Sequence, residues 1–219
     1  MTATLRQLDL NSTVVEATDV IVTDEQYLQA EPLMKDVRER AATVLLPLVA
    51  DGVTPVVTGF IGATADGVLT TLGRGGSDYS ATTLGAALDA DEIIIWTDVD
   101  GVLTADPRLV PTARLLREIS YNEAAELAYF GAKVLHPKTL RPVVESEIPV
   151  WIRNSFAPEK SGTRITTGGH PTEHEAGNNV EIRTIRDLKL FPVLWRVRIR
   201  SAANMNLYGF SPGRLRCTH

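Results

Sequence analysis

Short apolar runs alternate with helix-like stretches along most of the sequence, and this alternation limits the fold more than any other feature. The run EIIIWT (92–97) is apolar without interruption, as expected for a strand in a sheet that is covered on both faces. Further strands are predicted at 18–23, 54–60, 68–72 and 149–154, and helices at 31–52, 77–90, 120–132 and 136–147. This order predicts an α/β fold with a largely parallel sheet.

Local signals support several of these elements. Pro32 suits the first turn of the helix over 31–52, and Ser120 with Glu123 forms a capping box at the start of the helix over 120–132. The stretch WRVRIR (195–200) alternates apolar and basic residues, which predicts an edge strand with one polar face.

Charge and cysteine content narrow the class of protein. A net charge of −5 argues against nucleic acid as the main partner. The single cysteine, Cys217, cannot form an internal disulfide, so a reducing, cytoplasmic location is expected. No apolar run approaches the roughly 18 residues of a membrane span, so we expect no membrane association, and the first ten residues do not resemble a signal peptide.

The charge is also unevenly distributed. Residues 166–219 contain eight Lys and Arg against four Asp and Glu, whereas residues 1–165 contain 14 against 23. The change coincides with TTGGHPTEHEAGNN (166–179), whose Gly, Thr and Asn content predicts a linker or mobile loop. Its two histidines and two glutamates make a metal site conceivable, but a solvated loop is the favoured interpretation.

The turn GRGGSD (73–78) carries matched charges. In open α/β sheets, ligands bind beyond the carboxyl ends of the strands, where this turn is predicted to lie. Glycines let the backbone approach a ligand closely, and Ser77 can cap a helix whose first N–H groups favour an anion. Arg74 can pair with a carboxylate or phosphate, and Asp78 with an ammonium group. A free amino acid bears both charges, although an ordinary strand-to-helix turn explains the same residues.

Two further loops contain candidate binding residues. TDVDGVLTADPR (97–108) follows the apolar strand and could serve a nucleotide or magnesium, or could be an ordinary Asp-Gly turn. In FGAKVLHPKTL (130–140), Lys133 lies just past a predicted helix end. It could contact phosphate, or only complement the helix dipole. His136 is expected to cap or pack rather than to catalyse.

Together these loops resemble aspartokinases, which belong to the amino acid kinase family. GFIGATADGVLTTLGRGGSDYSA (59–81), WTDVDGVLTADPR (96–108) and FGAKVLHPKTL (130–140) occur in the order and spacing of that family, and the resemblance spans about residues 13–165. Sister kinases for N-acetylglutamate, glutamate or uridylate do not share GRGGSD together with AKVLHP. The resemblance implies a three-layer α/β/α domain over 1–165. It also implies that 180–219 begins like a regulatory ACT segment and continues as an atypical tail.

The resemblance also implies an activity: transfer of the γ-phosphoryl group of ATP to the side-chain carboxylate of L-aspartate. Mg²⁺ would be bound through the ATP phosphates, with no metal site made of protein ligands, and the protein would be a homo-oligomer. Substrate binding is implied for Phe60, Arg74, Ser77 and Asp78, with Arg74 and Asp78 as the catalytic pair. Nucleotide binding is implied for Thr97, Asp98, Leu103, Arg108, Lys133 and Val134. Leu103 stands where the family often has tyrosine.

The sequence also departs from the family. Aspartokinases open with a strand and a Lys-Phe-Gly-Gly-Thr/Ser loop that holds the transferring phosphate, followed later by a Gly-Glu-Arg segment. Neither occurs in these 219 residues. We therefore expect an N-terminally incomplete kinase domain, with an exposed apolar sheet edge and little activity in isolation. The alternative is an inactive kinase fragment that acts only as an assembly or interaction module.

Overall fold

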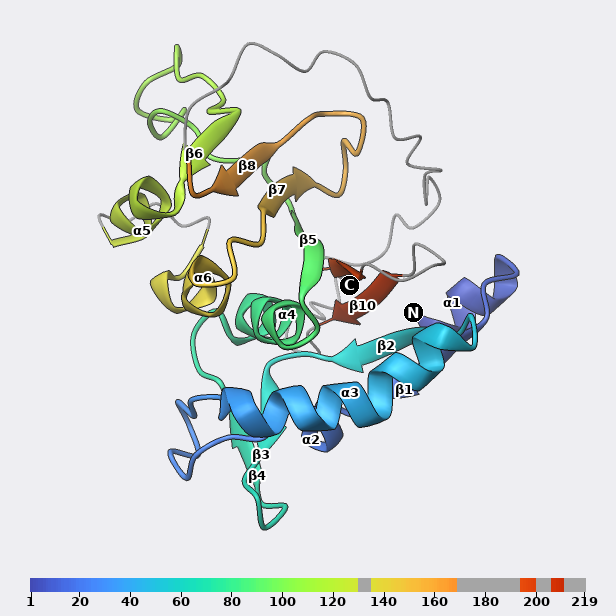
Figure 1. Cartoon of the computed structure of the whole chain (residues 1–219). Helices are drawn as coiled ribbons and strands as arrows, with labels where there is room; N and C mark the ends of the chain where they lie inside the picture. Colours follow the sequence, from blue (N-terminus) through green and yellow to red (C-terminus); the bar gives the residue numbers. More distant parts are fainter. Residues whose placement is uncertain (130–134, 169–193, 200–205, 211–219) are drawn as a thin grey trace, which may run out of the picture.

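The computed structural model describes residues 1–129, 135–168, 194–199 and 206–210, and an eight-stranded sheet lies at its centre (Figure 1). In spatial order the strands are β1 (Ser12–Val15), β2 (Thr54–Thr58), β10 (Asn206–Phe210), β9 (Leu194–Ile199), β5 (Ala90–Thr97), β7 (Val150–Asn154), β8 (Thr163–Thr166) and β6 (Glu118–Ser120). The neighbours β1–β2, β2–β10, β5–β7 and β8–β6 are parallel, and the other pairs are antiparallel. The predicted α/β class with a mostly parallel sheet is confirmed.

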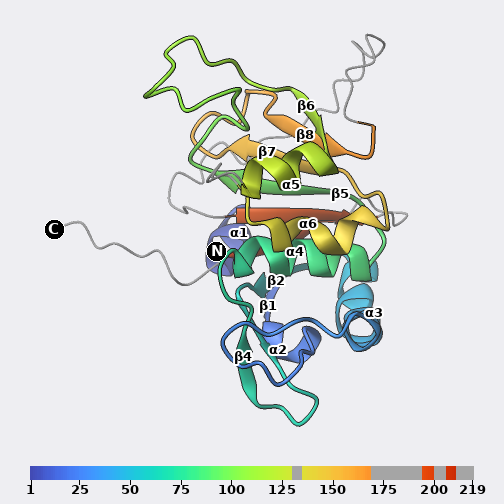
Figure 2. The same ribbon diagram turned by 90° about the vertical axis from the view of Figure 1, so that its left-hand side faces the viewer.

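The helices pack around this sheet. They are α1 (Thr2–Gln7), α2 (Ala17–Val20), α3 (Met34–Ala50), α4 (Gly76–Ala87), α5 (Tyr121–Tyr129) and α6 (Pro137–Val144). In Figure 2, α4, α5 and α6 lie together over one face of the sheet. The α4 helix is buried along nearly its whole length, because it contacts α3 and α6 as well as β5 and β9. A small hairpin of β3 (Ile61–Ala63) and β4 (Leu69–Thr71) leads into α4.

Most predicted elements are present, with three corrections. The strand predicted at 18–23 is wrong: Ala17–Val20 is a short helix, and Val22 and Thr23 make only isolated bridges. Ala17, Val20, Ile21 and Val22 are all buried, and a short buried apolar run does not by itself distinguish a helix from a strand. The helix predicted from residue 31 begins at Met34, since Pro32 bridges to Thr23 before the helix starts.

The third correction concerns the strand predicted at 195–200. It forms β9, but it lies inside the sheet between β10 and β5 rather than at an edge. Val197 is fully buried, and Arg198 pairs with Glu92 at 3.6 Å between Nε and Oε1, so an interior strand accommodates the alternating arginines. The β9–β10 hairpin thereby fills the space between β2 and β5, where each strand would otherwise leave unpaired backbone groups.

Within the described residues, no helix has the length and apolar character needed to cross a membrane. The predicted division into 1–165, 166–179 and 180–219 stays a prediction. Most of the segment 166–179, with its two histidines, lies outside the described residues.

Candidate functional site

The carboxyl ends of three strands lie along one edge of the sheet. β5 and β7 are parallel, and β10 is parallel to β2 but antiparallel to β9, which is antiparallel to β5. β2 and β5 therefore point the same way. This geometry places the residues after β2, β5 and β7 at the edge where ligands bind in open α/β sheets.

The GRGGSD turn forms the start of α4. Gly73 and Gly75 have φ angles of 76° and 71°, a left-handed conformation that favours glycine. Gly75 is the N-cap of α4, and no side chain caps the helix. The prediction that Ser77 caps it is wrong, because Ser77 lies within the first turn. The first N–H groups of α4 consequently receive no side-chain acceptor from a capping residue.

Ser77 is the most informative residue of the turn. It is only 9% exposed, and its hydroxyl has no hydrogen-bond partner in the described part of the chain. Buried polar atoms normally have a partner, so this hydroxyl at a helix N-terminus is available to a ligand or a water molecule. Arg74 is exposed beside it, and Asp78 is half-buried one residue further on.

Phe60 is held against the same helix turn. Its φ angle of 77° is rare for a residue with a side chain, and its N–H donates to Ser80 Oγ at 2.9 Å. Ser80 Oγ in turn donates to the carbonyl of Gly76 at 2.8 Å. A Cβ atom at Gly76 would lie 2.8 Å from Phe60 Cδ2, so only glycine allows this approach. Backbone strain of this kind is typical of functional sites.

The start of α6 covers the other side of the turn. A Cβ atom at Gly75 would lie 2.7 Å from His136 Cβ. His136 caps α6, since its Nδ1 accepts the backbone N–H of Lys138 at 3.3 Å. Burial, then the charges of Lys138 and Arg74, lower the pKa of His136 and keep its ring neutral for this role. Thr139 is fully buried and its hydroxyl has no described partner either, a feature that the sequence pattern did not reveal.

A second polar group follows β5 and β7. Thr97 and Asn154 are paired neighbours on the two strands, and Thr97 Oγ1 lies 3.2 Å from Asp98 Oδ1. Asp100 accepts hydrogen bonds from Asn154 Nδ2 and from Lys160 Nζ, each at 2.6 Å. The bond from Lys160, followed by that from Asn154, lowers the pKa of Asp100. Asp98 itself is exposed at the strand end.

The remaining predicted residues lie further along the loop after β5 or outside the described chain. Leu103 is half-buried and bridges to Leu115. Arg108 is exposed and forms a two-pronged pair with Asp106 of its own loop, at 3.0 and 2.7 Å. Lys133 and Val134 lie outside the described residues.

These observations define what the edge can bind. One turn offers a guanidinium, an unpaired hydroxyl, a helix N-terminus and a carboxylate, which together suit a small molecule carrying both charges. In the described ranges, no group of three or more His, Cys, Asp or Glu side chains could hold a metal ion.

The chain is similar in sequence to the amino acid kinase family and to known aspartokinases. A sequence profile described as the amino acid kinase family matches residues 1–154. Lysine-sensitive aspartokinase 3 of Escherichia coli (strain K12) is 46% identical over 161 residues, which are 74% of this chain and 36% of that protein. Chloroplastic aspartokinase 1 of Arabidopsis thaliana is 55% identical over 117 residues, 53% of this chain and 21% of that one.

A solved structure matches as well. The crystal structure of E. coli aspartokinase III in complex with aspartate and ADP superposes with a TM-score of 0.71 and 45% sequence identity, covering 74% of this chain and 36% of that one. The chain therefore spans well under half of the length of each of these proteins.

Proposed function

Because the chain belongs to the amino acid kinase family, we propose that it forms part of an aspartokinase, which transfers the γ-phosphoryl group of ATP to the side-chain carboxylate of L-aspartate. The observation that carries this proposal is the buried Ser77 hydroxyl at the N-terminus of α4, between Arg74 and Asp78, for which the described residues offer no hydrogen-bond partner. The aspartate and ADP bound in the E. coli structure support the same ligand classes.

The proposed roles follow from the chemistry of the turn. Arg74 is exposed and can swing to pair with a carboxylate of aspartate, in a geometry that its planar guanidinium favours. The Ser77 hydroxyl and the N–H groups of the first turn of α4 beyond Gly76, whose own N–H donates to the Gly73 carbonyl, donate to the same anionic substrate, and Asp78 accepts its ammonium group. Phe60 forms the apolar wall, because its contact with Gly76 fixes the ring beside the turn.

The nucleotide is proposed to bind at the second polar group, through Thr97, Asp98, Leu103 and Arg108, and through Lys133 and Val134. Magnesium, when bound with ATP, neutralises phosphate charge. Asp98, exposed at the end of β5, is the carboxylate that could face a water of that ion. Phosphoryl transfer depends mainly on positioning and charge, so no covalent intermediate with the protein is needed.

Hydroxylamine trapping of acyl phosphate tests the proposal. We expect at most slow formation of hydroxamate from purified chain, Mg²⁺, ATP and L-aspartate. Arg74→Ala should weaken aspartate binding, measured as KM or as Kd by calorimetry, by about 10- to 150-fold, since charged hydrogen bonds contribute about 1.5–3 kcal/mol. Arg40→Ala, an exposed change on α3, serves as the matched control. Absence of both hydroxamate and calorimetrically detected aspartate binding would refute the proposal for this chain.

A second candidate is an inactive kinase fragment that serves as an assembly module. Two observations favour it: the 219 residues contain no Lys-Phe-Gly-Gly stretch, and β9 and β10 occupy the space between β2 and β5. Aspartate binding without turnover would support this candidate. Light scattering of the purified chain tests the accompanying proposal of a homo-oligomer, and the cytoplasmic location stays a prediction.

A further inference from the structure

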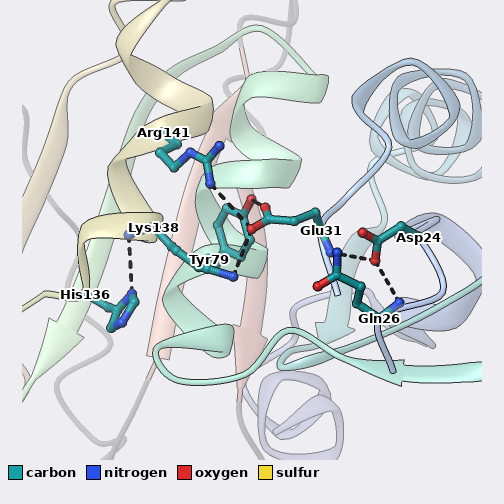
Figure 3. A network of polar contacts seen from close by, with 7 residues as sticks. All are labelled: Asp24, Gln26, Glu31, Tyr79, His136, Lys138 and Arg141. Atoms are coloured by element: carbon teal, nitrogen blue, oxygen red, sulfur yellow. Dashed lines mark hydrogen bonds and ion pairs between the residues drawn. The ribbon is translucent and has the colours of Figure 1, made fainter. Parts of the chain in front are cut away.

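Glu31 lies between the glycine turn and α6, and its backbone is held on both sides. Asp24 Oδ1 accepts the N–H groups of Gln26 and Glu31, each at 3.1 Å, and the Asp24 N–H donates to the Glu31 carbonyl at 3.0 Å (Figure 3). The neighbouring Ala30 N–H donates to the carbonyl of Thr71 at 2.9 Å. The segment before α3 is therefore fixed to β4, the strand that leads into GRGGSD.

The carboxylate of Glu31 contacts two helices at once. Oε2 accepts the hydroxyl of Tyr79, from α4, at 2.7 Å, and Oε1 lies 2.8 Å from Lys138 Nζ and 3.4 Å from Arg141 Nη1, both from α6. Figure 3 shows the carboxylate pointing between these side chains. Tyr79 directly follows Asp78, and Lys138 lies two residues after His136. One side chain thus bridges the two elements that enclose the proposed aspartate turn.

The protonation states of Glu31 and Tyr79 favour the contacts that join them to each other and Glu31 to Lys138. Burial alone would raise the pKa of Glu31, but hydrogen bonds from Lys138 and Tyr79 and the charges of Lys138 and Arg141 outweigh it and lower the pKa. Burial, then the hydrogen bond to Glu31, raises the pKa of Tyr79. Near neutral pH the carboxylate is therefore ionised, and Tyr79 keeps the proton that it donates.

Close packing makes the turn sensitive to this bridge. The backbone at Gly75 lies so near His136 that no Cβ atom fits between them. The hydroxyls of Ser77 and Thr139, which have no hydrogen-bond partner in the described part of the chain, lie on the two helices that meet there. A small shift of α6 relative to α4 would move these groups apart. We infer that Glu31 is a positioning residue: by joining Tyr79 to Lys138 it fixes the GRGGSD turn against the start of α6 in the geometry that binds the substrate.

The inference rests on the proposed function only for the identity of the ligand, L-aspartate, so the experiment has two readouts. The first is amide hydrogen exchange of residues 73–82, which include the Tyr79 N–H bonded to the Gly75 carbonyl at 2.9 Å. The second is the Kd for L-aspartate by calorimetry. The full chain is compared with Glu31→Gln, Tyr79→Phe and the double variant, with Glu39→Gln, an exposed carboxylate on α3, as the control.

Glu31→Gln should speed exchange in 73–82 by about three- to tenfold and leave residues 90–97 unchanged, because the neutral amide can still accept the Tyr79 hydroxyl but loses the charge that pairs with Lys138. It should weaken aspartate binding by a similar factor. The effects of Glu31→Gln and Tyr79→Phe should not add, since both weaken the same bridge between α4 and α6.

The outcomes distinguish a failure of the Glu31 inference from a failure of the proposed function. If residues 73–82 exchange no faster in Glu31→Gln than in Glu39→Gln, the proposed bridge between α4 and α6 is overturned. Faster exchange with an unchanged Kd would overturn its role in substrate binding. A wild-type chain that does not bind aspartate would refute the proposed function, while the exchange data would still decide whether Glu31 fixes the turn.

Discussion

Replacing Gly75 by alanine should destabilise the protein by more than its backbone conformation alone requires. Two effects combine at this position. The φ angle of 71° disfavours any residue with a Cβ atom, by about 1–2 kcal/mol, and the new methyl group would lie 2.7 Å from His136 Cβ. Overpacking of this kind adds about 1–3 kcal/mol, so the free energy of unfolding should fall by roughly 2–5 kcal/mol.

Gly52 provides a matched control. Its φ angle is 74°, nearly the same, but a Cβ atom there would have no neighbour within 4 Å among the residues that the structure describes. Gly52→Ala should therefore lower the free energy of unfolding by only about 1–2 kcal/mol. The loss of unfolded-state entropy on replacing glycine is common to both variants and cancels in the difference.

Urea denaturation measures both free energies, and calorimetry with L-aspartate measures the consequence for the site. Gly75→Ala should also weaken aspartate binding, because relief of the contact moves the turn away from His136, whereas Gly52→Ala should leave binding unchanged. Equal stability and equal binding of the two variants would refute the packing argument.

Three further results are expected. Val197→Asp should lower the free energy of unfolding by at least about 3 kcal/mol in urea denaturation, since it buries a carboxylate inside the sheet, whereas Val144→Asp at an exposed position should change it little. Stability should fall as pH drops below about 6.5, the ordinary pKa of histidine, because the pKa of His136 is lower in the folded state and the unfolded chain binds the proton first. His136→Asn, which can still cap α6, should reduce that slope, and an unchanged slope would contradict the assignment. Tyr121→Phe should lower the free energy of unfolding by about 1–3 kcal/mol in thermal or urea melts, because the buried carbonyl of Ile148 loses a 2.6 Å hydrogen bond.

The elements best predicted from sequence are those whose signals are local. EIIIWT gives β5 because an unbroken apolar run of that length fits a strand covered on both faces. The capping box at Ser120 and Glu123 forms as predicted, with Ser120 N–H and Oγ both within 2.8 Å of Glu123 Oε2. Pro137 opens α6 for a similar reason, since its missing N–H is not needed there.

The errors occur where contacts with distant parts of the chain, and not local sequence preference, determine the conformation or position of an element. Residues 18–23 are apolar enough for a strand, yet Ala17–Val20 form a helical turn whose first N–H donates to Thr58 Oγ1 at 2.8 Å. The arginines of β9 suggested an edge, but Arg198 finds Glu92 on the adjacent strand. In both cases the deciding partner is far away in the sequence, and no window of neighbouring residues contains it.

The candidate site likewise has features that follow from local sequence and features that depend on tertiary contacts. The sequence by itself determined the α/β class, the glycine turn at the start of α4 and the charged residues around it, because each depends on the conformational freedom or chemistry of residues next to one another. Only the tertiary structure decided that the hydroxyls of Ser77 and Thr139 are buried without a partner among the described residues and that His136 packs on Gly75. It also decided that Glu31 joins α4 to α6, since these contacts bring together segments separated by dozens of residues, whose approach is fixed by packing of the whole sheet and its helices.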